Sequence, residues 1–93
     1  KYLAVYGCGD QIGYPEWYQD AVGLLHDKLC SLGAKPLGYT SSEGYKFEKS
    51  KAAIDNNSRF VGLSVDEDNQ HEQTESRVSA WCEQVINEYN ATP

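Results

Sequence analysis

A glycine-rich turn followed by a tyrosine is the part of this 93-residue sequence whose residue types best suit chemistry. Gly7, Cys8, Gly9 and Asp10 come directly after an apolar segment, and Tyr14 lies four residues further on. Glycines allow a backbone to approach a flat ligand closely, aspartate offers a carboxylate or backbone contact to a ring N–H, and tyrosine offers a face for stacking. The pattern fits both a wall of a planar-ligand site and an ordinary tight turn.

The spacing of the residues disfavours a dinucleotide or phosphate loop at the glycine-rich turn and a calcium loop at the acidic run. The dinucleotide pattern GxGxxG fails because Ile12 stands in place of the third glycine, and no Lys-Ser/Thr pair follows as in a Walker loop. The acidic run at residues 66–70 does not match a calcium loop, since position six is His71 and position twelve is Arg77. We expect that run to be a solvated loop close to the ligand.

The elements that position this turn can be read from periodicity. Residues 1–6 are apolar and β-rich, which predicts a buried strand that ends at the turn. A second strand is predicted at residues 34–39. Before it, a helix is predicted to start near Pro15 and to end at Gly33. Between them one apolar stripe recurs at helical spacing: Trp17, Ala21, Leu24, Leu25, Leu29 and Leu32.

The second half begins with a polar stretch of little periodicity at residues 41–58, with a short extended piece expected at 45–47. A strand is predicted at 59–65 and a loop at 66–73, after which Thr74 can cap a last helix. Its apolar positions are Val78, Trp81, Cys82, Val85, Ile86 and Tyr89. Alternating strands and helices predict an α/β fold with parallel pairing in one domain.

Composition narrows the classes of function. The net charge is −6 with a pI near 4.7, which disfavours nucleic acid as a partner and suits docking on a basic protein. No apolar run reaches the roughly 18 residues of a membrane span. The three cysteines have no paired spacing, so we expect reduced thiols in a cytosol-like compartment. His26 and His71 lack partners at metal or catalytic spacing, and we expect both on the surface.

The whole chain resembles the C-terminal part of a long-chain flavodoxin of the cyanobacterial or algal kind. Similar segments occur in order at residues 1–20, 38–39, 44–45, 50–52, 60–63 and 66–70, and at Phe47, Thr74, Arg77 and Trp81. The resemblance implies the C-terminal part of a flavodoxin-like doubly wound parallel sheet, a three-layer α/β/α arrangement. Residues 1–93 would form part of one domain without a second domain, and 41–58 would be the insertion that splits the fifth strand of long-chain members.

The resemblance also implies a binding site for flavin mononucleotide (FMN). Tyr14 resembles the tyrosine stacked on the flavin, and Asp10 resembles the residue that contacts its pyrimidine edge. Cys8 and Gly9 resemble neighbours whose backbone meets the ring, while Gln19 and Asp68 match positions near the site. The family's phosphate-binding Thr/Ser-rich loop and its second aromatic wall have no counterpart in these residues, which predicts weak or absent FMN binding by the 93 residues alone.

The function implied is a low-potential one-electron carrier, and the chain presents no acid, base or nucleophile that would make it an enzyme. Implied partners are ferredoxin-NADP reductase and, in photosynthetic organisms, photosystem I. We expect no membrane insertion, a monomer when intact, and a cytoplasmic location, or the plastid stroma in an alga. The alternative is a flavin-free flavodoxin-like domain used for docking, which the missing phosphate loop favours.

Overall fold

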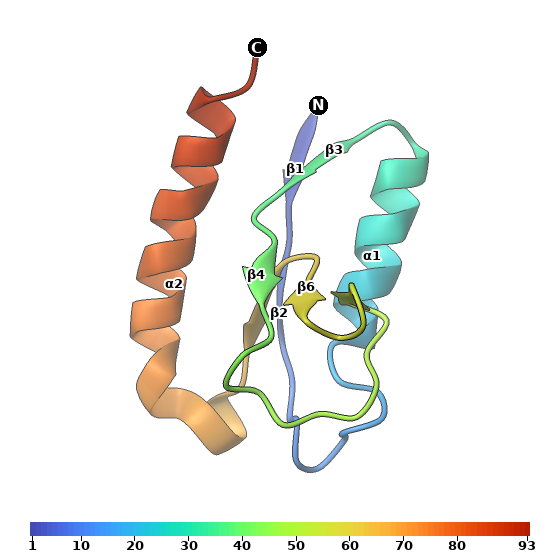
Figure 1. Cartoon of the computed structure of the whole chain (residues 1–93), viewed down its shortest axis with the longest axis vertical. Helices are drawn as coiled ribbons and strands as arrows, with labels where there is room; N and C mark the ends of the chain where they lie inside the picture. Colours follow the sequence, from blue (N-terminus) through green and yellow to red (C-terminus); the bar gives the residue numbers. More distant parts are fainter.

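The computed structural model describes residues 1–93 as two helices on opposite sides of short strands (Figure 1). In chain order the elements are β1 (Tyr2–Ala4), β2 (Tyr6–Cys8), α1 (Asp20–Ser31), β3 (Lys35–Leu37), β4 (Thr40–Ser41), β5 (Ala53–Ile54), β6 (Arg59–Phe60), β7 (Leu63–Val65) and α2 (Glu67–Asn90). The predicted order of strand, helix, strand, excursion, strand and helix is therefore confirmed. The layered arrangement is the predicted α/β/α class.

The first strand is longer than predicted and changes its pairing partner along its length. β1 pairs in parallel with β3, and β2 pairs in parallel with β7. Between them the carbonyl of Val5 accepts a hydrogen bond from the Leu63 amide. The change of partner follows from the chain between β3 and β7, which leaves the sheet after β3 and returns as β7. β2 continues through Cys8, two residues beyond the predicted end.

The first helix begins five residues later than predicted. Residues 11–19 form turns, and Gln19 precedes α1 in the left-handed conformation with φ 58°. The Pro15 carbonyl accepts the amides of Glu48 and Lys49, so it points to the excursion and does not start a helical ladder. The end of α1 is as predicted, since Gly33 has φ 99° and donates to the Cys30 carbonyl.

The excursion has more structure than its polar sequence indicates. β4, β5 and β6 form a three-stranded antiparallel sheet in the order β4-β6-β5. Three consecutive left-handed residues, Asp55, Asn56 and Asn57, make the turn between β5 and β6, and the short polar side chains of Asp and Asn tolerate that conformation. Residues 45–47 form no strand, and the predicted strand at 59–65 is divided into β6 and β7.

The predicted acidic loop at residues 66–73 is wrong, because α2 begins at Glu67. Asp66 is the N-cap, and its side chain accepts the Asn69 amide. Gln70 interrupts the first turns with φ −138° and ψ 36°. Thr74 consequently lies inside α2 and does not cap it. No helix of the structure combines the length and the apolar character that crossing a bilayer requires.

The core lies between α1, the strands and the excursion. Val5, Tyr18, Val22, Ala52, Phe60 and Val61 form its buried cluster. Phe60 has no exposed surface, and rings of Tyr18, Tyr45 and Phe47 surround it at centroid distances of 5.9, 5.1 and 5.1 Å. Burial raises the pKa of Tyr18 to about 12, so this phenol stays neutral at physiological pH.

The expected surface position of His26 on α1 is wrong, and the apolar stripe of the same region is uncovered. His26 is buried, with Nε2 2.6 Å from the Tyr39 hydroxyl and Nδ1 2.8 Å from Asp27. Cys30 Sγ lies 3.6 Å from the same Nε2, one helical turn further on. The predicted apolar stripe, in contrast, is largely exposed: Trp17, Leu24, Leu25 and Leu32 are between 50% and 70% accessible. The stripe is real in the sequence, but nothing in these 93 residues covers it.

Candidate functional site

The turn that follows β2 is fastened by its own aspartate. Asp10 Oδ1 accepts the backbone amides of Ile12 at 3.1 Å and Gly13 at 2.7 Å, and the Asn69 side-chain amide at 2.7 Å. The Tyr14 amide donates to the Asp10 carbonyl. Aspartate side chains stabilise turns in this way. Of the two contacts expected from Asp10, carboxylate or backbone, the carboxylate is therefore already engaged within the turn.

Tyr14 stands on the open side of this loop. Its side chain is 59% exposed, and its ring stacks loosely on that of Trp17, at 6.5 Å and an interplanar angle of 27°. A hollow of about 270 Å³ opens beside the two rings. Its walls include five of the six predicted site residues, namely Cys8, Gly9, Asp10, Tyr14 and Gln19.

One backbone donor in the loop remains available. The amide of Gly9 donates to Val65, that of Gln11 to Asp66, and those of residues 12–14 to Asp10. The Asp10 amide has no hydrogen bond within the chain. A phosphate cradle needs several convergent free amides, so the loop does not fit a phosphate. One free N–H beside an open aromatic face fits the edge and the face of a flat ring.

The glycines of the turn allow the segment at the start of α1 to pack closely against β2. A Cβ at Gly7 would lie 2.4 Å from Val22 Cγ2, and one at Gly9 would lie 3.0 Å from the ring of Tyr18. Both positions therefore admit the start of α1 close to the strand. Gln19, buried at the start of that helix, donates from Nε2 to the carbonyl of Gly7 at 3.0 Å. The side chain of Gln19 thus holds α1 to β2 at the back of the hollow.

A second acidic group behind the loop was missed by the sequence analysis. Asp66 has no exposed surface and accepts hydrogen bonds from the backbone and side chain of Gln11 at 2.9 and 2.8 Å. Asp68, the sixth predicted site residue, lies next to it and is exposed. Carboxylate oxygens of Asp10, Asp66 and Asp68 all fall within 4.8 Å of one another. The structure thus brings the two predicted aspartates together around a third.

The side-chain amide of Asn69 bridges two of these carboxylates. The Asn69 side-chain nitrogen lies 2.7 Å from Asp10 Oδ1 and 2.9 Å from Asp66 Oδ2. Hydrogen bonds led by that from the Gly13 amide lower the pKa of Asp10. Burial opposes ionisation of Asp66, but hydrogen bonds from Gln11 and Asn69 outweigh it and lower its pKa as well. Both groups are therefore ionised near neutral pH.

Sequence reasoning could have found Asp66 from one signal. An aspartate directly after a predicted buried strand is typical of a helix N-cap. Gln11 carries no such signal, because its partners lie 55 and 59 residues further along the chain. Only the tertiary fold brings these residues together.

Comparisons with known proteins agree with this geometry. A family model described as Flavodoxin matches residues 1–81. Flavodoxin 2 of Escherichia coli K12 is 50% identical over 88 residues, which cover 95% of this chain and 51% of that protein. The flavodoxin of Synechococcus elongatus is 46% identical over 89 residues, covering 96% and 51%. The chain spans about half the length of the curated relatives it matches.

Solved structures give the same result. The crystal structure of Fusobacterium nucleatum flavodoxin bound to flavin mononucleotide superposes with a TM-score of 0.81 at 32% identity, covering 95% of this chain and 52% of that one. The K13G mutant of that flavodoxin, also bound to flavin mononucleotide, gives a TM-score of 0.87 and covers 95% and 51%. Fold and sequence therefore lead to one family.

Proposed function

The chain belongs to the flavodoxin family, and from that premise we propose that it supplies one wall of an FMN site in a low-potential one-electron carrier. One observation carries the proposal: the open ring of Tyr14 and the unpaired amide of Asp10 occur in one loop at the end of a parallel strand. In open α/β sheets, ligands bind beyond the carboxyl ends of strands.

The residues of this wall have distinct tasks. Tyr14 stacks on the isoalloxazine ring, and the Asp10 amide donates to an acceptor on the ring's pyrimidine edge. The Asp10 carboxylate keeps the turn in shape through its bonds to Ile12 and Gly13. When bound, FMN supplies the one-electron chemistry, while the protein binds and orients the ring and sets its electrostatic surroundings.

The three clustered aspartates give those surroundings a negative sign. Asp10, Asp66 and Asp68 lie together behind and beside the loop, and the whole chain carries a net charge of −6. Negative charge near a ring that gains electrons opposes their addition by Coulomb repulsion, which lowers the reduction potential. This charge supports the low-potential part of the proposal.

Redox partners follow from the same charge. We propose docking on basic surfaces of ferredoxin-NADP reductase and, in a photosynthetic host, photosystem I, through weak and salt-sensitive encounters. All three cysteines are free thiols, which suits the cytoplasm or a plastid stroma. We propose a monomer for the complete carrier.

A flavin-free docking domain is the second candidate. It is favoured by one observation, the engagement of every loop amide except that of Asp10, which leaves this loop without a phosphate cradle. In the first candidate, residues outside these 93 must bind the phosphate and cover the second face of the ring. The two candidates therefore differ in whether FMN binds once such residues are present.

A fusion that places the amino-terminal half of E. coli Flavodoxin 2 before Lys1 separates them. We expect the fusion to quench FMN fluorescence at far lower protein concentration than the 93-residue chain does. Tyr14→Ala should weaken binding about tenfold, the equivalent of about 1.4 kcal/mol of stacking. Tyr89→Ala, an equally exposed tyrosine on α2, is the control and should leave affinity unchanged. Absence of quenching would support the docking domain, whereas quenching that both variants weaken equally would contradict the stacking role of Tyr14.

A further inference from the structure

Gln11 is a glutamine almost entirely buried inside a surface loop. It is 1% exposed, and its side-chain amide donates at 2.8 Å to both Asp66 Oδ2 and Gln70 Oε1. Its side-chain oxygen accepts the backbone amide of Lys46 in the excursion. Every polar atom of this side chain therefore has a partner. Burial of an amide is costly unless it is fully hydrogen-bonded, so the loop has one strongly preferred position against these partners.

Asp66 is the centre of that arrangement. Three N–H donors converge on its Oδ2: the Gln11 backbone amide, the Gln11 side chain and the Asn69 side chain, at 2.9, 2.8 and 2.9 Å. The backbone amide and side chain of Asn69 also reach Oδ1, at 3.0 and 3.1 Å. Both oxygens act only as acceptors, so an ionised carboxylate is the group that satisfies all of these donors.

The break in α2 at Gln70 completes the connection. Because Gln70 leaves helical geometry, its side chain lies between the loop and the excursion, accepting from Gln11 and donating to the Gly44 carbonyl at 2.7 Å. Arg77, two turns further along α2, donates to the same Gln70 oxygen at 2.8 Å. The loop, the helix and the excursion are thus joined through one polar network, which is buried at Gln11 and Asp66 and more exposed at Gln70.

We propose that Asp66 is a positioning residue of the FMN site, which acts through Gln11 to fix the 9–14 loop and thereby the placement of Tyr14 and of the Asp10 amide. The inference rests on the proposed function, since it concerns how that wall is held. Asp66 does not touch the ring. Its effect on affinity passes through the orientation of the loop, whereas an exposed acid acts on the flavin only through its charge.

Asp10 and Asp66 stabilise the loop in different ways. Asp10 holds the turn in its own shape, with bonds to amides two and three residues away. Asp66 lies 55 residues away in sequence from Gln11 and orients the finished turn against β7 and α2. Asn69 bonds to both carboxylates and makes the two functions interdependent. Loss of Asp66 therefore leaves a formed turn that is no longer fixed in place.

The test compares Asp66→Asn with Glu67→Gln in the 93-residue chain. Both remove one negative charge at the start of α2, but Glu67 is exposed and makes no side-chain hydrogen bond. An asparagine at position 66 presents an NH₂ to converging donors whichever way it is turned. We expect amide hydrogen exchange at residues 11–13 to increase about tenfold relative to the Leu63 amide in Asp66→Asn, and to stay unchanged in Glu67→Gln.

The second readout is FMN affinity in the fusion described above. Asp66→Asn should weaken FMN about tenfold more than Glu67→Gln and reduce the circular dichroism of the bound flavin, which reports stacking on Tyr14. If Asp66→Asn does not fold, Gln11→Met provides the same comparison, because it removes both side-chain donors and leaves the helix cap intact. Loop exchange equal to that of Glu67→Gln overturns the proposal, as does increased exchange with equal FMN affinities. Failure of the unsubstituted fusion to bind FMN overturns the proposed function instead, and exchange alone then decides whether Asp66 anchors the loop.

Discussion

The loop at the end of β2 and the outer faces of the helices differ in how complete they are. The buried side chains of Gln11 and Asp66 have all of their hydrogen-bond partners within these 93 residues. The helix faces instead expose large apolar side chains, including Leu24, Leu25, Leu32, Val78, Ile86 and Tyr89. α2 buries no residue at all. Polar groups can be satisfied by a few neighbours, whereas apolar burial requires a further layer of structure.

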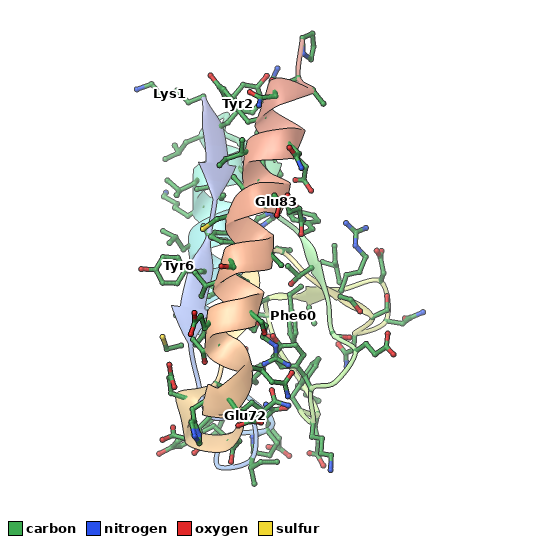
Figure 2. The ribbon with its side chains drawn as sticks, turned by 90° about the vertical axis from the view of Figure 1, so that its left-hand side faces the viewer. Lys1, Tyr2, Tyr6, Phe60, Glu72 and Glu83 are labelled. Atoms are coloured by element: carbon green, nitrogen blue, oxygen red, sulfur yellow. The ribbon has the colours of Figure 1, made fainter.

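The free edge of β1 and β2 is, like the outer helix faces, a surface that these 93 residues leave uncovered. β1 and β2 each pair on one side only, so their other edge carries unpaired backbone groups. Tyr6 on this strand is 65% exposed (Figure 2), and its ring meets only that of Trp81, edge-on at 6.2 Å. An apolar hollow of about 380 Å³ lies between β1 and α2, lined only by hydrophobic residues. Together these features contrast with the closed polar network at the other end of the strand.

The largest effect is expected in the small core itself. Phe60→Ala removes the ring at the centre of the aromatic cluster and should cost about 3–5 kcal/mol, which is comparable to the stability of a chain of this length. We expect the cooperative transition in urea to disappear. The control Leu24→Ala truncates a side chain that is 56% exposed and should change stability by less than about 0.5 kcal/mol. Equal losses in the two variants would contradict the distinction between core and uncovered face.

The sequence predicted what depends on local pattern. The order of strands and helices, the end of α1 at Gly33 and the apolar stripes all follow from spacing along the chain. The start of α1 was wrong because Pro15 makes its hydrogen bonds with the excursion, which no local rule reveals. His26 was placed on the surface for a similar reason, since its partner Tyr39 belongs to another element.

In the candidate site, too, the residues that follow from local pattern could be predicted and those that depend on long-range contacts could not. Five of the nine residues that line the hollow could be predicted, because they lie between one strand and the next helix and resemble one family motif. Their individual contacts could not. The Asp10 carboxylate is used within the turn, and Gln11 acquires its importance only through Asp66. Roles that arise from long-range hydrogen bonds require the folded structure.

The uncovered face of α1 gives the second prediction. Leu25 is 50% exposed, so Leu25→Ala should change the stability of the 93-residue chain by less than about 0.5 kcal/mol. In the fusion with the half of E. coli Flavodoxin 2 the same change should cost about 2–3 kcal/mol, because the added layer buries the side chain. Urea unfolding of both backgrounds measures the difference. Identical small effects would mean that this face of α1 stays uncovered in the fusion.

Acid should act selectively on the polar region. Hydrogen bonds lower the pKa values of Asp10 and Asp66 from an ordinary 3.8. Stability from these ionised groups is complete above that value and is lost as the pH falls through the folded-state pKa. Asp66→Asn should cost about 2 kcal/mol at pH 7 and flatten the decline of stability between about pH 5 and 2. Glu67→Gln should keep the decline, and a decline unchanged in Asp66→Asn would contradict the assignment.

The smallest effect concerns the buried histidine that joins α1 to the start of the excursion. Tyr39→Phe removes the hydroxyl that lies 2.6 Å from His26 Nε2, while the ring keeps its packing against Arg59 at 5.3 Å. One hydrogen bond of this kind contributes about 1 kcal/mol, so the urea midpoint should fall by a corresponding amount. Tyr2→Phe, whose hydroxyl has no partner within the chain, is the matched control and should leave the midpoint unchanged. The bond joins α1 to the segment around Tyr39, whereas the 9–14 loop is held by separate bonds to Asp10 and Asp66. Loss of the Tyr39 hydroxyl should therefore raise amide exchange near Tyr39 and leave the 9–14 loop protected. Increased exchange in that loop would instead show that the His26–Tyr39 pair and the network around Asp66 depend on each other.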